Sequence, residues 1–160
     1  MTLSKEILHS EKLDSVLRSL QKEIEASDGL IPGQFKNEDI ILLYELGYNL
    51  YQAGSYSESC DIFQRLVIAK PFECRYWQAY GSALFVLKKH EDALVAWSMW
   101  CLIDDENPKP HFHAAETLFS AGKISEGFKA LDAAEKRDVN KFLVEKIEGL
   151  KMAWRLHAEN

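Results

Sequence analysis

The stretch LYELGYNLYQAGSYSESCDIF, residues 43–63, decides the fold of this chain because its pattern returns twice further along the sequence. Equivalent positions lie 34 residues apart. Two sets of small residues and one set of large apolar residues keep this interval: Gly47, Gly81 and Ala115; Ser59, Ala93 and Gly127; Phe63, Trp97 and Leu131. A fixed period of this length indicates a protein built from stacked structural repeats.

Each repeat is predicted to form two antiparallel helices joined by a short turn, the first turn falling at residues 53–55. Apolar residues recur with helical spacing through most of the chain. Small residues in one helix allow its partner to lie close, and the large apolar residue fills the space beside the crossing. One pair of helices cannot bury its own apolar face, so three stacked pairs share a continuous core. We expect these units at residues 40–73, 74–107 and 108–141.

These phased positions resemble the tetratricopeptide repeat. The first unit matches it best, with the following residues at the positions of the motif: Leu43, Leu46, Gly47, Gly54, Tyr56, Ser59, Phe63 and Pro71. The second and third units keep the small and large positions, whereas the closing proline of the motif is present only as Pro71. The resemblance implies an all-α fold, a short concave solenoid in which the first helix of each pair lines the concave face.

One further helix is predicted on each side of the repeats. Residues 1–36 are expected to form an N-terminal helix and a linker that contains proline and glycine, residues 37–141 the three repeats, and residues 142–160 a C-terminal capping helix. In this last helix Leu143, Ile147, Leu150 and Trp154 share one face, which covers the apolar end of the solenoid.

The N-terminal segment carries an apolar stripe with helical spacing, formed by Leu13, Val16, Leu17, Leu20 and Ile24. An amphipathic helix of this kind needs a partner surface. Two interpretations stay open: self-association of the chain as a dimer through Leu13, Val16, Leu17 and Leu20, and packing of the stripe on the first repeat of its own chain.

Charge and composition exclude several classes of partner. The 160 residues include 19 basic and 25 acidic side chains, a formal net charge of -6. This balance argues against nucleic acid and against anionic membrane surfaces, both of which are bound by clustered Lys and Arg. The sequence has neither an apolar run that could span a bilayer nor the apolar core of a signal peptide, so we expect a cytoplasmic protein with free thiols at its three cysteines.

The concave face of the predicted solenoid is rich in aromatic side chains. If the small residue of each first helix faces the partner helix, residues three before, one after and four after it face the groove. The cargo-binding candidates on this face, with one neighbouring histidine, are Tyr44, Tyr48, Tyr51, Gln78, Ser82, Phe85, Phe112, His113, Glu116 and Phe119. For Phe85 and Phe119 a place in the core is equally open, whereas three tyrosine hydroxyls are hard to bury and favour the groove.

No arrangement of residues typical of an enzyme or a metal site is present in the sequence. His111 and His113 are two residues apart, so on a helix they point to different sides and do not share a metal ion. Glu116, three residues after His113, is expected to pair with it on the surface. We find no glycine-rich phosphate loop and no nucleophile elbow, so we predict no catalytic residues, no cofactor and no metal.

Two stretches resemble a narrower family, the class II chaperones of bacterial type III secretion, or translocator chaperones of the LcrH/SycD type. They are NLYQAGSY at residues 49–56 and PKPHFHAAE at residues 108–116. The phrase FHAAE within the second stretch is more specific than the general repeat pattern. The resemblance covers about residues 38–137, while the end helices match by position and character.

This resemblance implies a non-enzymatic chaperone of the bacterial cytoplasm that binds hydrophobic translocator proteins before their secretion. Members hold an extended, proline-containing segment of the translocator in the concave groove and commonly self-associate through the N-terminal region. Carried onto this sequence, the first pocket candidates are Tyr44, Tyr48 and Tyr51, followed by Phe112, His113 and Glu116.

The alternative is a general tetratricopeptide adaptor that binds a peptide or the C-terminal carboxylate of another protein. A carboxylate-binding site of this kind needs Lys, Arg and Asn side chains on the concave face. Arg75 and Lys109 are the main basic residues expected near it, among a majority of aromatic and neutral positions. The chaperone interpretation is therefore ranked first.

Overall fold

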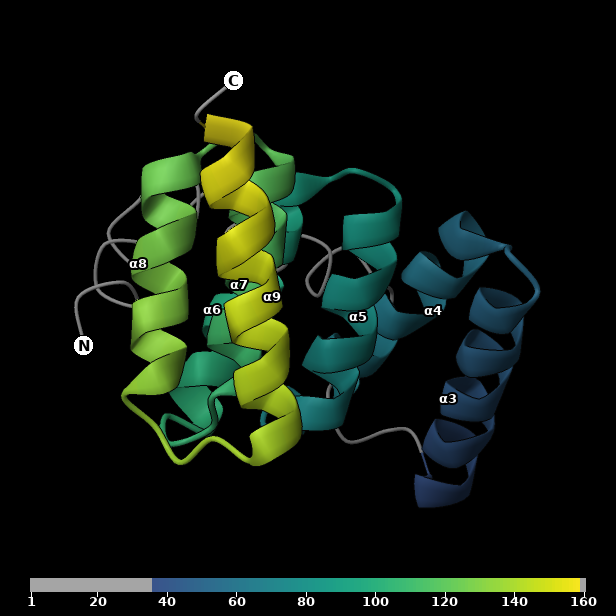
Figure 1. The fold of residues 1–160 in the computed structure, drawn as a ribbon. Coiled ribbons are helices and arrows are strands. Elements are labelled where there is room, and N and C mark those ends of the chain that lie inside the picture. The colour runs from purple at the N-terminus through teal and green to yellow at the C-terminus, as the bar shows by residue number, and fades with distance from the viewer. Residues whose placement is uncertain (1–35, 159–160) are drawn as a thin grey trace.

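The structure, a computed structural model, describes residues 36–158, which contain seven helices and no strand. Six of the helices form three antiparallel pairs, and a longer helix follows them: α3 (Asn37–Gln52) with α4 (Tyr56–Ala69), α5 (Cys74–Val86) with α6 (His90–Ile103), α7 (Lys109–Ser120) with α8 (Ile124–Glu135), and α9 (Lys141–Ala158). Figure 1 shows them as a row, with α3 and α4 at one end and α8 and α9 at the other. The predicted all-α repeat fold is confirmed.

The predicted N-terminal helix and linker, apart from Lys36, lie outside the described residues. The self-association stripe of Leu13, Val16, Leu17 and Leu20 therefore stays a prediction. Among the described residues, no helix is both long enough and apolar enough to cross a membrane.

The three pairs share one turn geometry. The residues Gly54, Lys88 and Gly122, each 34 positions apart, have positive φ angles of 83°, 58° and 76°. In each turn the next residue donates its backbone N–H to the carbonyl oxygen five residues earlier, at 2.8–2.9 Å. This is the hydrogen bond that closes a helix with a left-handed residue, a conformation that glycine adopts without the steric cost of a Cβ. Lys88 takes the same conformation at that cost.

Exchanging residues at this turn position should change stability in opposite directions. We expect Lys88→Gly to raise the free energy of unfolding by about 0.5–1 kcal/mol, and Gly122→Lys to lower it by a similar amount. Gly122→Lys is a matched control because a Cβ on Gly122 would meet nothing within 4 Å. This substitution therefore tests only the cost of the backbone conformation. Urea unfolding measures both, and a loss of stability in Lys88→Gly would contradict the prediction.

Within each pair the helices approach through a small residue and a ring. A Cβ atom built on Gly47 would lie 2.7 Å from Phe63 Cε1, and one built on Gly81 would lie 2.7 Å from Trp97 Cζ3. The third pair reverses the roles, because the ring of Phe119 in the first helix lies against Gly127 in the second. The predicted packing of small residues beside large ones therefore holds, with a change of direction in the last repeat.

The close approach at Gly81 predicts a cost for any side chain there. Gly81→Ala should lower the free energy of unfolding by about 1–3 kcal/mol because Trp97, which is almost fully buried, must move. Gly149→Ala in α9 is the control, since its added methyl group meets open space and alanine favours the helix by about 0.5–1 kcal/mol. Equal effects of the two substitutions in urea unfolding would show that the contact with Trp97 is unimportant.

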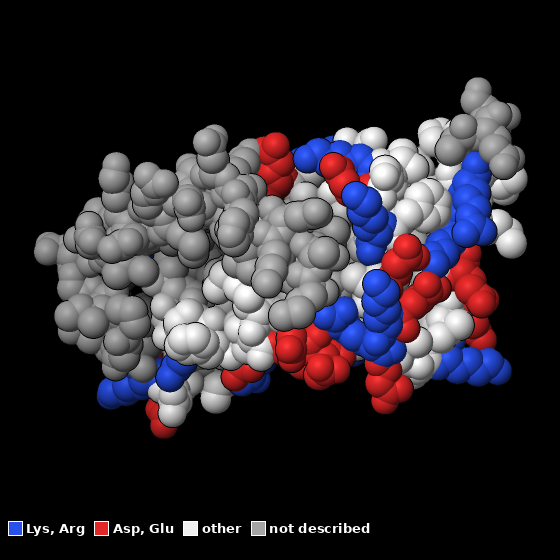
Figure 2. Space-filling model, turned by 90° about the vertical axis from the view of Figure 1, so that its left-hand side faces the viewer, with Lys and Arg blue, Asp and Glu red and all other residues white. Residues whose placement is uncertain are grey.

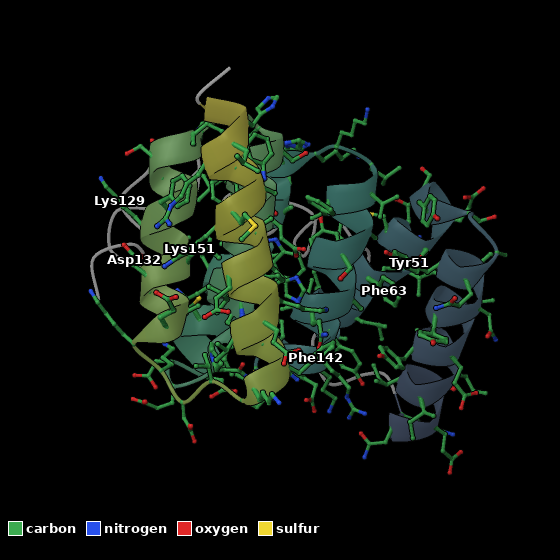
Figure 3. All side chains as sticks on the ribbon, viewed as in Figure 1. Tyr51, Phe63, Lys129, Asp132, Phe142 and Lys151 are labelled. Carbon is green, nitrogen blue, oxygen red and sulfur yellow. The ribbon has the colours of Figure 1, made fainter. Side chains whose placement is uncertain are left out.

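Helix α9 covers the last pair, as predicted for a C-terminal cap. Its residues Leu143 and Ile147 are buried, and the ring of Trp154 stacks on Phe119 of α7 with centroids 5.1 Å apart. The ammonium group of Lys151 donates hydrogen bonds to Asp132 and Glu135 of α8, at 3.2 and 2.7 Å. Lys151 and Asp132 are labelled in Figure 3 on these two neighbouring helices. Apolar packing and these ion pairs together hold α9 against the row.

Candidate functional site

A cavity of about 200 Å³ opens where α3, α4 and α5 meet. Its walls combine aromatic rings with hydroxyl groups, amides and one guanidinium group, and the lining residues are Tyr44, Tyr48, Tyr51, Gln52, Phe63, Arg75, Gln78, Ala79 and Ser82. Five of these were candidates from the sequence, so the structure brings the predicted positions of the first two repeats together. In Figure 3, Tyr51 and Phe63 mark this region at the end of the molecule away from α9.

The floor of the cavity is a cluster of rings around Tyr44. The ring centroid of Tyr44 lies 6.1 Å from that of Phe63 and 5.6 Å from that of Tyr76, in tilted arrangements. Such tilted contacts are favourable for aromatic rings and fix their orientation. Tyr44 is therefore half-buried and held in place, with Tyr48, which is half exposed, at the open side of the cavity.

Tyr51 forms the other wall. Its ring lies edge-on to Tyr56 with centroids 5.1 Å apart. Burial raises the pKa of the Tyr51 hydroxyl, and the neighbouring Tyr56 raises it further. The hydroxyl therefore stays protonated at neutral pH and can donate a hydrogen bond.

Arg75 supplies the positive charge among the lining residues. Its guanidinium carbon lies 6.0 Å from the ring centre of Tyr44 and 5.2 Å from that of Tyr76, so it is placed for cation–π contact with both. It also pairs with Glu73 at 3.3 Å in an exposed ion pair. Together with Gln78 and Ser82 it offers hydrogen-bond donors beside an apolar floor. This arrangement suits binding of a peptide rather than chemistry on a substrate.

The candidates from the third repeat lie outside this cavity. Phe119 is 1% exposed because Trp154 of α9 stacks on it, and Phe112 is 6% exposed. Phe119 therefore takes the core position that the sequence left open, and neither ring offers surface to a ligand. Phe85 is half-buried and stacks on His90 at 6.3 Å, also away from the cavity.

His113 and Glu116 form the pair expected from their spacing. His113 Nδ1 lies 2.9 Å from Glu116 Oε2. The imidazole also stacks on Trp97 and Trp100 of α6, with centroids 5.0 and 6.2 Å away. Both side chains are partly exposed, but they do not line the cavity. They stay candidates for a second contact region on α7.

Sequence reasoning did not select Gln52, Phe63 or Ala79 for the site, and it named Arg75 only as a plausible neighbour. The 34-residue period predicts a place in the core for Phe63 and gives no sign of a second role. In the structure Phe63 is buried and its ring also contacts the cavity-lining Tyr44. A core residue can therefore also line a cavity, which periodicity does not reveal.

A buried cysteine–histidine contact lies between α6 and α7. Cys101 Sγ is 3.6 Å from His111 Nε2. Burial and, to a smaller extent, the charge of Arg137 lower the pKa of His111 to about 4, while burial raises the pKa of Cys101 to about 12. A catalytic pair needs a thiolate near neutral pH, and here both groups are neutral. Among residues 36–158, no group of three or more His, Cys, Asp or Glu side chains is arranged to hold a metal ion.

The buried His111 predicts a loss of stability on acidification. Its folded pKa of about 4 lies below the unfolded value of about 6.5, so the unfolded chain binds more protons between these pH values. Stability is therefore full above pH 6.5 and falls as the pH drops toward 4, by about 2 kcal/mol between pH 7 and pH 5.

Urea unfolding at the two pH values measures this loss, and His111→Gln is the comparison because its side chain does not titrate. The variant should show a smaller pH dependence than the natural chain, whatever its absolute stability. The same pH dependence in both chains would contradict the assignment to His111.

The charges on the surface are mixed. On the face shown in Figure 2, Lys and Arg side chains of the described residues alternate with Asp and Glu, and no broad basic patch gathers there. This distribution agrees with the acidic balance of the sequence, and the described residues on that face form no basic footprint for nucleic acid.

The fold and the cavity define a helical-repeat protein of the tetratricopeptide type with an aromatic peptide-binding candidate site. No protein-family model matches the chain. The chain is 26% identical over 103 residues to low calcium response locus protein H of Yersinia pestis, across 64% of this chain. The match spans 61% of the length of that relative, and the protein of the same name from Yersinia pseudotuberculosis matches equally well.

Solved structures with the same fold include two complexes. The Yersinia enterocolitica type III secretion chaperone SycD with a peptide of the translocator YopD is 25% identical, with a TM-score of 0.71 over 79% of this chain and 99% of that one. PcrH with the chaperone binding region of PopD is 28% identical, with a TM-score of 0.67 over 78% and 97%. The chain is a homologue of low calcium response locus protein H and a structural match to the class II type III secretion translocator chaperones.

Proposed function

We propose that this chain is a type III secretion chaperone that binds an extended segment of a translocator protein in the cavity between α3, α4 and α5. The observation that carries the proposal is the aromatic cavity itself, whose lining includes Tyr44, Tyr48 and Tyr51. The complexes of SycD and PcrH with translocator segments support the class of partner. The role is binding without catalysis, in the bacterial cytoplasm before secretion.

The cavity suits the apolar and extended segments that such a partner contains. Translocators later enter a membrane, so their apolar segments aggregate in water unless they are covered. A chaperone that binds this exposed state lowers its free concentration. An extended segment with prolines loses little conformational freedom on docking, because proline already restricts its backbone. Rings such as Tyr44 and Tyr51 then act as anchors, while Arg75 and Gln78 can donate hydrogen bonds to backbone carbonyl groups.

A second candidate function is an adaptor that binds the C-terminal carboxylate of a partner. The position of Arg75 in the cavity wall is the observation that favours it. A carboxylate grip normally combines several cationic and amide donors, whereas here one guanidinium group stands among rings and neutral groups. We therefore rank this function second.

Removing a ring from the cavity should weaken cargo binding. We expect Tyr44→Ala and Tyr51→Ala each to raise the dissociation constant for a translocator peptide by about tenfold or more, with helicity unchanged. Phe142→Ala is the matched control, because this ring is 66% exposed on α9, outside the cavity. Isothermal titration measures all three, and unchanged affinity in both tyrosine variants would reject the cavity as the binding site.

The class of partner is tested separately. Pull-down with the full chain from a lysate of its source bacterium, followed by mass spectrometry, should recover a secreted protein with membrane-inserting segments. A peptide from the bound region is then titrated with a free and with an amidated C-terminus. Equal affinities support the chaperone role, whereas loss of binding on amidation would favour the carboxylate-binding adaptor.

A further inference from the structure

The cavity between α3, α4 and α5 has two chemically different ends. Helices α3 and α5 run in the same direction along the row (Figure 1), so their first turns lie toward one end of the cavity. Arg75 lines that end from the first turn of α5, whereas Gln52 and Ser82 line the cavity further along the helices. The helical rise from Arg75 to Ser82 is about 10 Å, the length of about three residues in an extended chain.

The charge of Arg75 is not balanced within the cavity. Among the described residues that line it, Arg75 is the one cationic side chain and no side chain is a carboxylate. The start of α5 adds to this positive charge, because the N-terminus of a helix is the positive end of its dipole. A carboxylate group of a bound segment is therefore stabilised at this end, where it can accept hydrogen bonds from the guanidinium group.

The contacts of Arg75 leave its guanidinium group accessible to a ligand. The group lies over the rings of Tyr44 and Tyr76, which hold its plane and lower the entropy cost of forming a further hydrogen bond. One N–H donates to Glu73 at 3.3 Å, in an ion pair whose side chains are 57% and 45% exposed. Exposed pairs of this kind contribute little to stability, so a carboxylate from a ligand can join or replace Glu73.

The equivalent start of α7 has a different arrangement. Lys109 and Asn107 stand 34 residues after Arg75 and Glu73. The side chain of Asn107 accepts a hydrogen bond from the backbone N–H of Lys109 at 3.0 Å, whereas the side chain of Glu73 pairs with Arg75. Lys109 is exposed and does not line the cavity. The cationic cavity wall therefore belongs to α5 and is not a general property of the repeat.

We propose that Arg75 makes the cavity selective for cargo segments that carry an aspartate or glutamate about three residues from an apolar anchor. The anchor lies against Tyr51, and the carboxylate accepts hydrogen bonds from Arg75 at the other end. This inference rests on the proposed function, because it names the chemistry of the segment bound at the same site. The net charge of -6 sharpens the selectivity, since an acidic residue elsewhere in the segment finds no cationic partner among the described lining residues.

A glutamate scan of the bound peptide tests this selectivity. The probe is the translocator peptide recovered in the pull-down, acetylated and amidated so that neither end is charged. Glutamate and then glutamine are placed at each position in turn, and isothermal titration measures each pair with the full chain. We expect one position, about three residues from the apolar anchor, at which the glutamate form binds about tenfold more tightly than the glutamine form.

Three variants assign the difference to Arg75. Arg75→Gln should bring the two forms to within about twofold of each other, with the glutamine form bound as in the natural chain. Glu73→Gln removes the competing carboxylate and should tighten binding of the glutamate form by about two- to threefold. Lys109→Gln is the matched control, because it removes the equivalent exposed charge outside the cavity and should preserve the difference. Circular dichroism checks that each variant is folded.

Equal affinities of the glutamate and glutamine forms at every position would overturn the proposal. Equal weakening of both forms by Arg75→Gln would also overturn it and would assign Arg75 to the support of Tyr44. The same loss of selectivity in Lys109→Gln would attribute the difference to the overall charge of the chain. Failure of the proposed function is distinguishable from these results, because it would appear as unchanged binding of both forms by Tyr44→Ala.

Discussion

The structure depends on one repeated constraint, the contact between a residue without a side chain and a ring from the paired helix. At Gly47 and Gly81 a Cβ atom would lie only 2.7 Å from the ring of Phe63 or Trp97, closer than such atoms can approach. This contact sets the distance and the rotation of the two helices together. Once Gly47 faces Phe63, Tyr44 and Tyr51 lie at the side of α3 that meets α5, and the cavity follows from that rotation.

Repeats that share this contact can still differ in the side chains around it and on their surfaces. In the first pair, Ser59 Oγ donates to the carbonyl oxygen of Gly47 at 2.8 Å, so the crossing is reinforced by a hydrogen bond. In the third pair the ring comes from α7 and is covered by Trp154 of α9. The repeat therefore gives the backbone its regular row, while the side chains make one end a binding candidate and the other a closed core.

The sequence predicts the part of this structure that is periodic. The pairing of helices, the turns at Gly54 and Gly122, and the place of the tyrosines all follow from residue types that recur every 34 positions. Phe119 shows where such reasoning ends, because its burial depends on Trp154, which belongs to no repeat. Phe63 shows a second limit, since a ring that serves the core can also form a cavity wall. Contacts outside the period need the folded chain.

The row arrangement has a consequence for how the molecule responds to a bound segment. Each helix packs mainly on the helices just before and after it in the chain. In such a one-dimensional stack, stabilisation passes from neighbour to neighbour and fades with distance. A ligand in the cavity touches α3, α4 and α5, so it would slow local opening at that end far more than at α9. Occupied and empty forms would thus differ in where the chain unfolds first.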